Sequence, residues 1–156
     1  MFGKEAMSAD DGMRAFAAKS PVPEFATTAW TTPKPLNQST VAIVTSAALH
    51  SVNDKRFSGG DTSYRVIDRA ERELVLGHWS QNFDRSGLSI DLNVVYPIDR
   101  LEELAANGTI GAVANKHYSF AGNQPDDVAT LRLDSGPAAA AEMLADGVDV
   151  VLLTPV

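Results

Sequence analysis

From about residue 40 to the end, the chain contains short apolar runs that are separated by polar and glycine-containing stretches. The runs Val41–Val44, Leu74–Leu76 and Val148–Thr154 are rich in valine and leucine and are bounded by polar residues. Val41–Val44 fits a strand that is buried on both faces, as in a parallel sheet, and Leu74–Leu76 fits another short strand. Ser63–Ile67 shows a further extended pattern. These segments predict strands, and the last is expected to be a buried strand that ends at a ligand crevice.

Two segments carry helical signals instead. Ile98, Leu101, Leu104 and Ala105 follow helical spacing, and Gly108 stands where a helix ends. A second helix is predicted over 135–145, with Ser135 as its cap, a proline in its first turn and a glycine after it. The alternation of strands and helices predicts an α/β fold: a mostly parallel sheet flanked by helices, a Rossmann-like or flavodoxin-like three-layer sandwich.

The polar stretches between these elements predict loops. We expect a turn over Thr45–His50, surface loops over 51–61 and 82–93, and a loop beside the sheet over His117–Gly122. Residues 1–38 differ from the rest. They predict a short helix over Asp10–Lys19, capped by Ser8, and then an extended arm imposed by Pro21, Pro23, Pro33 and Pro35. The predicted division is therefore an arm over 1–38 and an α/β domain over 39–156.

Composition narrows the classes of function. The net charge of −7 and the absence of basic clusters argue against nucleic-acid binding. No apolar run is long enough to span a bilayer, and Glu5, Asp10 and Asp11 lie where a signal peptide would be apolar. We therefore expect a cytoplasmic protein that binds neither membrane nor nucleic acid. The chain contains no cysteine, so it holds neither a thiol nucleophile nor a thiolate metal site.

Histidine and arginine supply the candidate chemistry. His50, His78 and His117 each follow a predicted strand or lie in a predicted loop, but their spacing matches no metal motif, and separate structural roles are favoured over a metal site. Arg65 lies in an otherwise apolar segment, and its planar guanidinium suits a substrate carboxylate. The favoured alternative is that Arg65 pairs with Asp61, Asp84 or Asp91 and orders a loop.

Five blocks taken together resemble a known family. They are Thr40–Ser46 with His50, Asp61–Ile67, Asp91–Leu101, Ile110–Gly111 with His117–Gly122, and Ala145–Pro155. In this order they are similar to the N-terminal part of the selenoprotein B family, the substrate-specific B component of glycine, sarcosine, betaine and D-proline reductases. The resemblance runs from about Trp30 to the end of the chain. Ala121 departs from it, because relatives often carry a bulkier residue there.

The resemblance implies an oxidoreductase chemistry. A selenocysteine or cysteine attacks a small amino acid, or its N-methylated relative, and the bond between the α-carbon and nitrogen is cleaved reductively. The family places this nucleophile shortly after the Thr154-Pro155 pair, so we expect it downstream of Val156 and expect no other cofactor in the chain. A selenocysteine codon read as a stop would produce this truncation, and a genuine N-terminal fragment is the alternative. In either case we expect this chain alone to be inactive and the fold to be incomplete.

The candidate site residues lie at predicted strand ends within the matching blocks. Arg65 is expected to hold the substrate carboxylate, and His50 or His117 to protonate the departing amine. The remaining substrate-binding candidates are Thr45, Ser46, Ser63, Tyr64 and Ser119. We expect a small amino acid and other subunits of a reductase complex as partners. Apolar sheet left uncovered predicts an oligomer.

Two other classes of function stay open. A non-catalytic α/β binding or scaffold subunit needs a crevice and Arg65 but no nucleophile. A metal-dependent lyase would need the three histidines to bind a metal ion.

Overall fold

A computed structural model describes residues 8–19, 26–27, 31–80, 85–122, 124 and 128–156. Glu5, Pro21, Pro23, Trp30 and Asp84 lie outside these residues. The chain forms two compact units, 1–32 and 33–156. In the first unit, helix α1 (Ala9–Ala17) confirms the predicted helix, and the side chain of Ser8 accepts a hydrogen bond from the backbone N–H of Asp11, as an N-cap does.

The second unit contains a central sheet built around β1 (Thr40–Thr45). Strand β1 pairs in parallel with β7 (Val150–Thr154) on one side; on the other side it pairs in parallel with β5 (Ala112–Val113) at its start and with β6 (Lys116–Phe120) at its end. Strand β3 (Tyr64–Asp68) pairs with β6 in the antiparallel direction. The sheet is therefore mostly parallel, with β3 and β7 at its edges.

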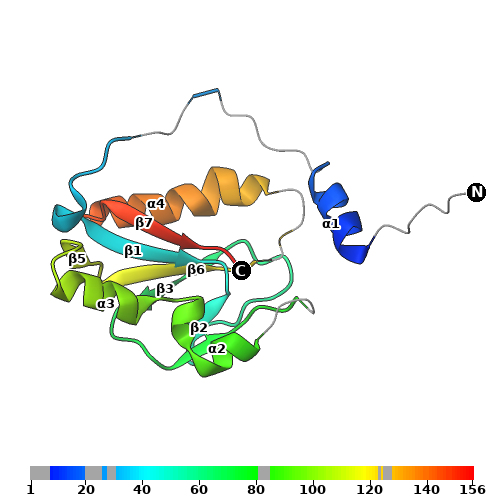
Figure 1. The fold of residues 1–156 in the computed structure, drawn as a ribbon, viewed down its shortest axis with the longest axis horizontal. Helices are drawn as coiled ribbons and strands as arrows, with labels where there is room; N and C mark the ends of the chain where they lie inside the picture. The colour runs from blue at the N-terminus through cyan, green and yellow to red at the C-terminus, as the bar shows by residue number, and fades with distance from the viewer. Residues whose placement is uncertain (1–7, 20–25, 28–30, 81–84, 123, 125–127) are drawn as a thin grey trace, which may run out of the picture. The chain divides into compact units, whose positions relative to one another are not determined.

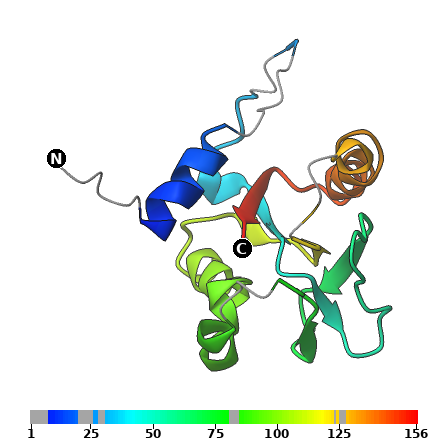
Figure 2. The ribbon, with the colours of Figure 1, turned by 90° about the vertical axis from the view of Figure 1, so that its right-hand side faces the viewer.

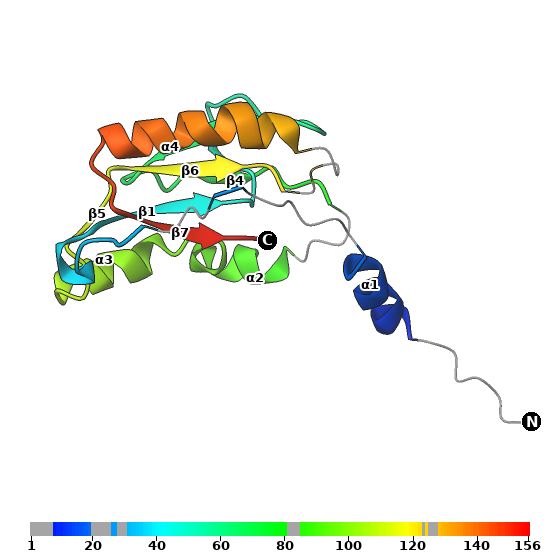
Figure 3. The ribbon, with the colours of Figure 1, turned by 90° about the horizontal axis from the view of Figure 1, so that it is seen from above.

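Helices cover both faces of this sheet, which confirms the predicted α/β fold. Helix α4 (Gly136–Ala145) lies on one face, while α3 (Ile98–Ala106) and α2 (Ser86–Ile90) lie on the other (Figure 1; Figure 3). Figure 2 shows α4 and α3 on opposite sides of the strands. Strand β1 supplies both cores, because alternate side chains point to opposite faces: Val41 and Ile43 pack with the α3 side, and Ala42 packs with the α4 side.

Glycines follow α3 and α4 as predicted. Gly108 follows α3 and Gly147 follows α4, and both have a positive φ, 77° and 76° respectively. This left-handed conformation carries no steric penalty for glycine, which has no Cβ. None of the helices in the described ranges is long and apolar enough to cross a membrane.

Four local predictions were wrong. The predicted loop His117–Gly122 contains most of strand β6. The predicted loop 82–93 contains α2 and most of the 3₁₀ helix η2 (Leu92–Val94) in its described part. The predicted turn Thr45–His50 runs into strand β2 (Leu49–Ser51), and Ala48 between them has a φ of 54°. Ser135 does not cap α4, because the π-helical turn η3 (Leu131–Ser135) precedes it and Ser135 already has helical backbone angles.

The 3₁₀ helix η1 and a small second sheet complete the second unit. Helix η1 (Leu36–Gln38) precedes β1, and β2 forms an antiparallel pair with β4 (Leu74–Leu76), separate from the main sheet. The prediction of a buried final strand was also wrong, because Val151, Leu152 and Leu153 of β7 are 37%, 38% and 67% exposed.

Candidate functional site

The carboxyl ends of the parallel strands β1, β6 and β7 lie at the same end of the sheet. We call this end, where the strands stop, the strand-end edge. Because β3 is antiparallel to β6, the start of β3 lies at this edge as well. Thr45 of β1 stands opposite both Thr154 of β7 and Ser119 of β6, and Ser119 stands opposite Arg65 of β3. Residues opposite one another in a sheet share a face. The fold therefore places Thr154, Thr45, Ser119 and Arg65 in one polar row across four strands.

Most hydroxyl groups of this row have partners in the protein. Thr45 Oγ1 accepts a hydrogen bond from Ala47 N at 3.2 Å and donates to Thr154 O at 3.4 Å. Thr154 Oγ1 donates to Val95 O at 2.9 Å. Ser119 differs, because its Oγ is buried and has no hydrogen-bond partner among the described residues. A buried hydroxyl without a partner is costly. Ser119 is the residue of this row whose hydroxyl forms no hydrogen bond with the described residues.

Ser46, the next residue of the chain, holds the segment after β7. Its Oγ accepts a hydrogen bond from Val156 N at 2.9 Å and donates to Val156 O at 3.2 Å. The backbone O of Ser46 also accepts from Gly122 N at 2.8 Å. An apolar cavity of about 220 Å³ lies at this edge, lined by Val44, Thr45, Ser46, Phe120, Leu153, Thr154 and Pro155.

Arg65 orders the loop that precedes β3. Its Nη2 lies 3.0 Å from Asp61 Oδ2, its Nη1 donates to Ser63 Oγ at 2.7 Å, and its Nε donates to Lys55 O at 2.8 Å. The guanidinium carbon also lies 4.2 Å from the centre of the Phe57 ring. Burial acts to raise the pKa of Asp61, but hydrogen bonds from Ser63 and Arg65 outweigh it and lower that pKa. The loop-ordering alternative for Arg65, with Asp61 as its partner, is the arrangement that the structure contains.

Tyr64 lies on the opposite face of the sheet. Its hydroxyl donates to Glu142 Oε1 of α4 at 2.6 Å, and this hydrogen bond raises the pKa of Tyr64 to about 12. The Tyr64 ring also packs against Tyr118 and Phe120. Tyr64 thus joins β3 to α4, while Ser63 remains at the strand-end edge through its contacts with Asp61 and Arg65.

His117 is built into the sheet. Its Nδ1 accepts a hydrogen bond from the backbone N of Ile43 at 3.0 Å, so Nε2 carries the proton of the neutral ring. Burial, assisted by the charge of Arg69, lowers the pKa of His117 to about 4. Its Nε2 is buried without a partner in the described part of the chain, and its ring stands edge-on to Tyr96 at 5.4 Å between centroids. The ring is therefore neutral at pH 7 and takes the place of a backbone acceptor.

The other two histidines have separate surroundings. His50 Nδ1 lies 3.1 Å from Ala48 O, and its ring makes an edge contact with Phe57. His78 lies behind Gly122, where an added Cβ would come within 2.7 Å of His78 Nε2 and 3.0 Å of Ser46 O. Burial and then the charge of Arg85 lower the pKa of His78. Among the described residues no group of three or more His, Asp or Glu side chains is arranged to hold a metal ion.

His78 is the histidine that sequence reasoning did not choose, although it lies against the loop that follows β6. The available signal was its position directly after the Leu74–Leu76 strand. The proton-donor roles of His50 and His117 stay predictions.

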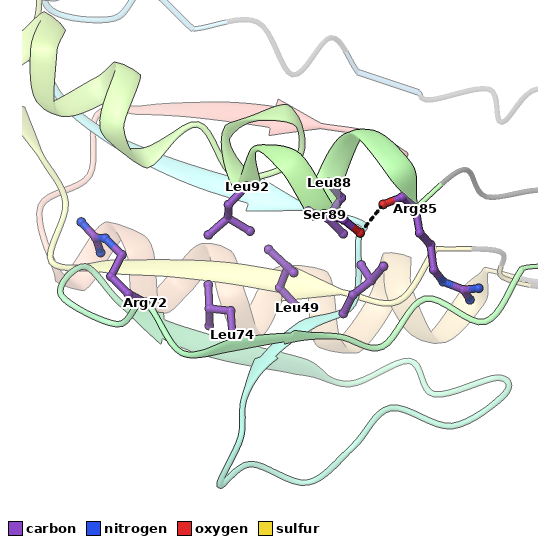
Figure 4. Close-up of a pocket in the computed structure, with 8 residues that line it drawn as sticks. Leu49, Arg72, Leu74, Arg85, Leu88, Ser89 and Leu92 are labelled. Carbon is purple, nitrogen blue, oxygen red and sulfur yellow. Dashed lines mark hydrogen bonds between the residues drawn. The ribbon is translucent and has the colours of Figure 1, made fainter.

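A second cavity, of about 400 Å³, was not foreseen from the sequence. It lies between the β2/β4 pair and the segment that contains α2 and η2, and we call it the leucine cavity (Figure 4). Leu88 and Leu92 are four residues apart, which is the spacing of one helix face, and this spacing in the predicted loop 82–93 was the available indication of a helix there. Its lining residues are Leu49, Arg72, Leu74, Leu76, Arg85, Leu88, Ser89 and Leu92.

Comparison with known proteins identifies relatives. Residues 12–156 match the glycine/sarcosine/betaine reductase selenoprotein B family. The chain is 37% identical over 124 residues to the D-proline reductase subunit gamma of Acetoanaerobium sticklandii. This match covers 78% of this chain and 50% of that protein. The chain is also 30% identical over 129 residues to the glycine reductase complex component B subunit gamma of Carboxydothermus hydrogenoformans. That match covers 78% of this chain and 29% of that protein. The chain thus spans about half, or less, of the length of these relatives. No solved structure matches.

Proposed function

Because this chain belongs to the glycine/sarcosine/betaine reductase selenoprotein B family, we propose that it forms the substrate-side part of a reductase subunit that cleaves a carbon–nitrogen bond in a small amino acid. The observation that supports this proposal best is the polar row at the strand-end edge, where the buried Ser119 hydroxyl has no hydrogen-bond partner within the described part of the chain. In open α/β sheets, ligands bind outside the carboxyl ends of the strands. Ser119 is the hydroxyl group best placed to position a substrate there, because the Ser46 hydroxyl already bonds to Val156.

The nucleophile has to come from outside these residues, because the chain contains no cysteine. In the proposed reaction a selenol or thiol attacks the α-carbon, and the carbon–nitrogen bond breaks as the amine takes up a proton. A dithiol then releases the carboxylic acid product and becomes a disulfide, which accounts for the two electrons of the reduction. We propose that a selenocysteine or cysteine downstream of Val156 supplies the attacking group.

Activity of a longer polypeptide tests this proposal. A chain that continues past Val156 through the selenocysteine, or a cysteine in its place, should release amine from glycine, sarcosine, betaine or D-proline when dithiothreitol and the partner subunits are present. Ser119→Ala should lower kcat/KM at least about tenfold, since it removes a hydrogen bond in the site. Ser58→Ala, at an exposed position, is the matched control. Turnover of none of the four compounds, or an equal effect of the two substitutions, would contradict the proposal.

A non-catalytic binding subunit is the second candidate. The leucine cavity favours it, because that cavity offers apolar lining and two arginines without any need for a nucleophile. This candidate predicts that the longer polypeptide binds an amino acid with a measurable Kd and releases no amine.

We also propose that the chain assembles with other reductase subunits. The names of both relatives describe subunits of reductases. Strand β7 supports this, since it exposes Leu152 and Leu153 at the edge of the sheet.

A further inference from the structure

The leucine cavity has walls from two layers of the fold. Leu49 of β2 and both Leu74 and Leu76 of β4 form one wall, while Leu88 of α2 and Leu92 of η2 form the other. Figure 4 shows the labelled leucines, Leu49, Leu74, Leu88 and Leu92, on the two sides of the same space. A volume of about 400 Å³ falls within the range of small-molecule sites, which are mostly apolar with a few polar groups that fix orientation. The middle of this cavity therefore suits an aliphatic group.

Arginines stand at its two ends. Arg72 lies at one end and Arg85 at the other, with the leucines between them (Figure 4). A guanidinium at the rim of an apolar space favours a ligand that carries a carboxylate, because the fork of N–H groups matches two carboxylate oxygens.

The two arginines differ in how many hydrogen bonds and ion pairs their guanidinium groups form with the described residues. Arg72 Nη1 donates to Arg69 O at 2.6 Å and to Glu71 O at 3.0 Å, and its Nη2 lies 4.0 Å from a carboxylate oxygen of Asp99. Within the described ranges Arg85 makes one side-chain hydrogen bond, from Nη2 to His78 O at 2.6 Å, and no ion pair. Arg85 thus keeps Nε and Nη1 as donors and has no carboxylate partner there, so its charge is the better placed to hold an anion.

Arg65 supplies the contrast. Its donors are committed to Asp61, Ser63 and the backbone of the preceding loop, and its side chain is 10% exposed. We propose that the leucine cavity binds a small carboxylic acid with an aliphatic body, that Arg85 holds the carboxylate, and that the leucines enclose the body.

The Arg85 end of the cavity is also the end nearer to the strand-end edge. Arg85 bonds to the backbone of His78, and the His78 ring lies against Gly122, whose N–H bonds to Ser46 O. The identity of the natural ligand as an amino acid rests on the proposed function. The chemistry of the cavity by itself requires only the aliphatic carboxylate.

Calorimetric titration of the 156-residue chain with sodium hexanoate tests the site. Hexanoate should bind, while acetate, which lacks the body, and hexan-1-ol, which lacks the charge, should bind at least about tenfold more weakly. Arg85→Gln should raise the hexanoate Kd at least about tenfold. Arg72→Gln, at the far end, should raise the Kd less than Arg85→Gln does, because Arg72 already donates to protein acceptors. Arg100→Gln, on α3 and outside the cavity lining, is the matched control and should leave the Kd unchanged. All three arginines are exposed, so the variants are expected to fold, which a thermal melt of each checks.

Several outcomes would overturn the inference: no hexanoate binding, equal binding of hexan-1-ol, or a larger loss for Arg72→Gln than for Arg85→Gln. D-Proline and glycine, titrated in the same way, separate this inference from the proposed function. D-Proline should bind through Arg85 and more tightly than glycine, because it has an apolar ring. Hexanoate binding through Arg85, without binding of either amino acid, would support the cavity as a carboxylate site and count against its role as the amino-acid site.

Discussion

His117 shows how a residue that looks catalytic can have a structural role. In the sequence it follows a polar lysine in a stretch expected to be a loop, whereas in the fold it is a fully buried residue of β6. Its Nδ1 accepts the N–H of Ile43 at a point where β1 passes from pairing with β5 to pairing with β6. The ring satisfies a backbone donor that would otherwise be buried and unpaired.

The lowered pKa of His117 predicts a pH dependence of stability. In the unfolded chain the imidazole takes up a proton as the pH falls through about 6.5, whereas in the folded chain it does so only near 4. The unfolded state therefore binds more protons between these values, so stability is fully present above about pH 6.5 and declines as the pH falls toward 4. His78, whose pKa is also lowered, acts in the same direction.

We expect the free energy of unfolding to fall by about 2 kcal/mol from pH 7 to pH 5 through His117 alone. Urea denaturation at the two pH values measures this change. His117→Asn should be less stable at pH 7, because Ile43 N–H loses a well-placed acceptor, and should lose much of the pH dependence. A variant that keeps the full dependence would show that other groups cause it.

Among the elements, β7 and β6 depart most from the sequence prediction. The apolar sequence of β7 indicates a buried strand, and the polar sequence of β6 indicates an exposed loop, but the structure shows the reverse burial for each. The apolar β7 is half exposed at the edge of the sheet, while the polar His117 and Ser119 of β6 are fully buried beside β1. The order of the strands decides their burial here, because a central strand has a neighbouring strand on both sides, whereas an edge strand has a neighbour on one side only.

An exposed apolar edge strand predicts self-association of this polypeptide. Light scattering should give a mass above the 16.6 kDa of one chain. Leu153→Lys should shift the mass toward that of the monomer, because a charge on an edge strand opposes pairing. Leu36→Lys, in η1, replaces another exposed leucine and should leave the mass unchanged. A monomeric parent chain, or equal effects of both substitutions, would contradict this prediction.

At the scale of the whole molecule, the chain divides into units of very different character. Helix α1 of the first unit buries none of its residues, whereas the second unit contains the cores on both sides of the sheet. The stability of the fold should therefore reside in residues 33–156.

Removal of residues 1–32 tests this view. The shortened chain should melt within about 2 °C of the full chain, because none of the described residues of this segment belongs to the two sheet cores. Differential scanning calorimetry measures both values. As a positive control, Leu101→Ala, in the α3 core, should lower the Tm well beyond this margin. A large drop on deletion would mean that the first unit stabilises the second.

The sequence by itself determined the class of fold, the helices α1, α3 and α4, the strand β1 and the family. These follow from local patterns, such as helical spacing closed by a glycine and an apolar β-branched run, and from ordered blocks of residues. Only the tertiary structure decided that Thr45, Ser119, Thr154 and Arg65 form one row, that Asp61 engages Arg65, and that a leucine cavity lies beside Arg85. Those facts depend on strand order, register and the packing of distant segments, which no short stretch of sequence encodes.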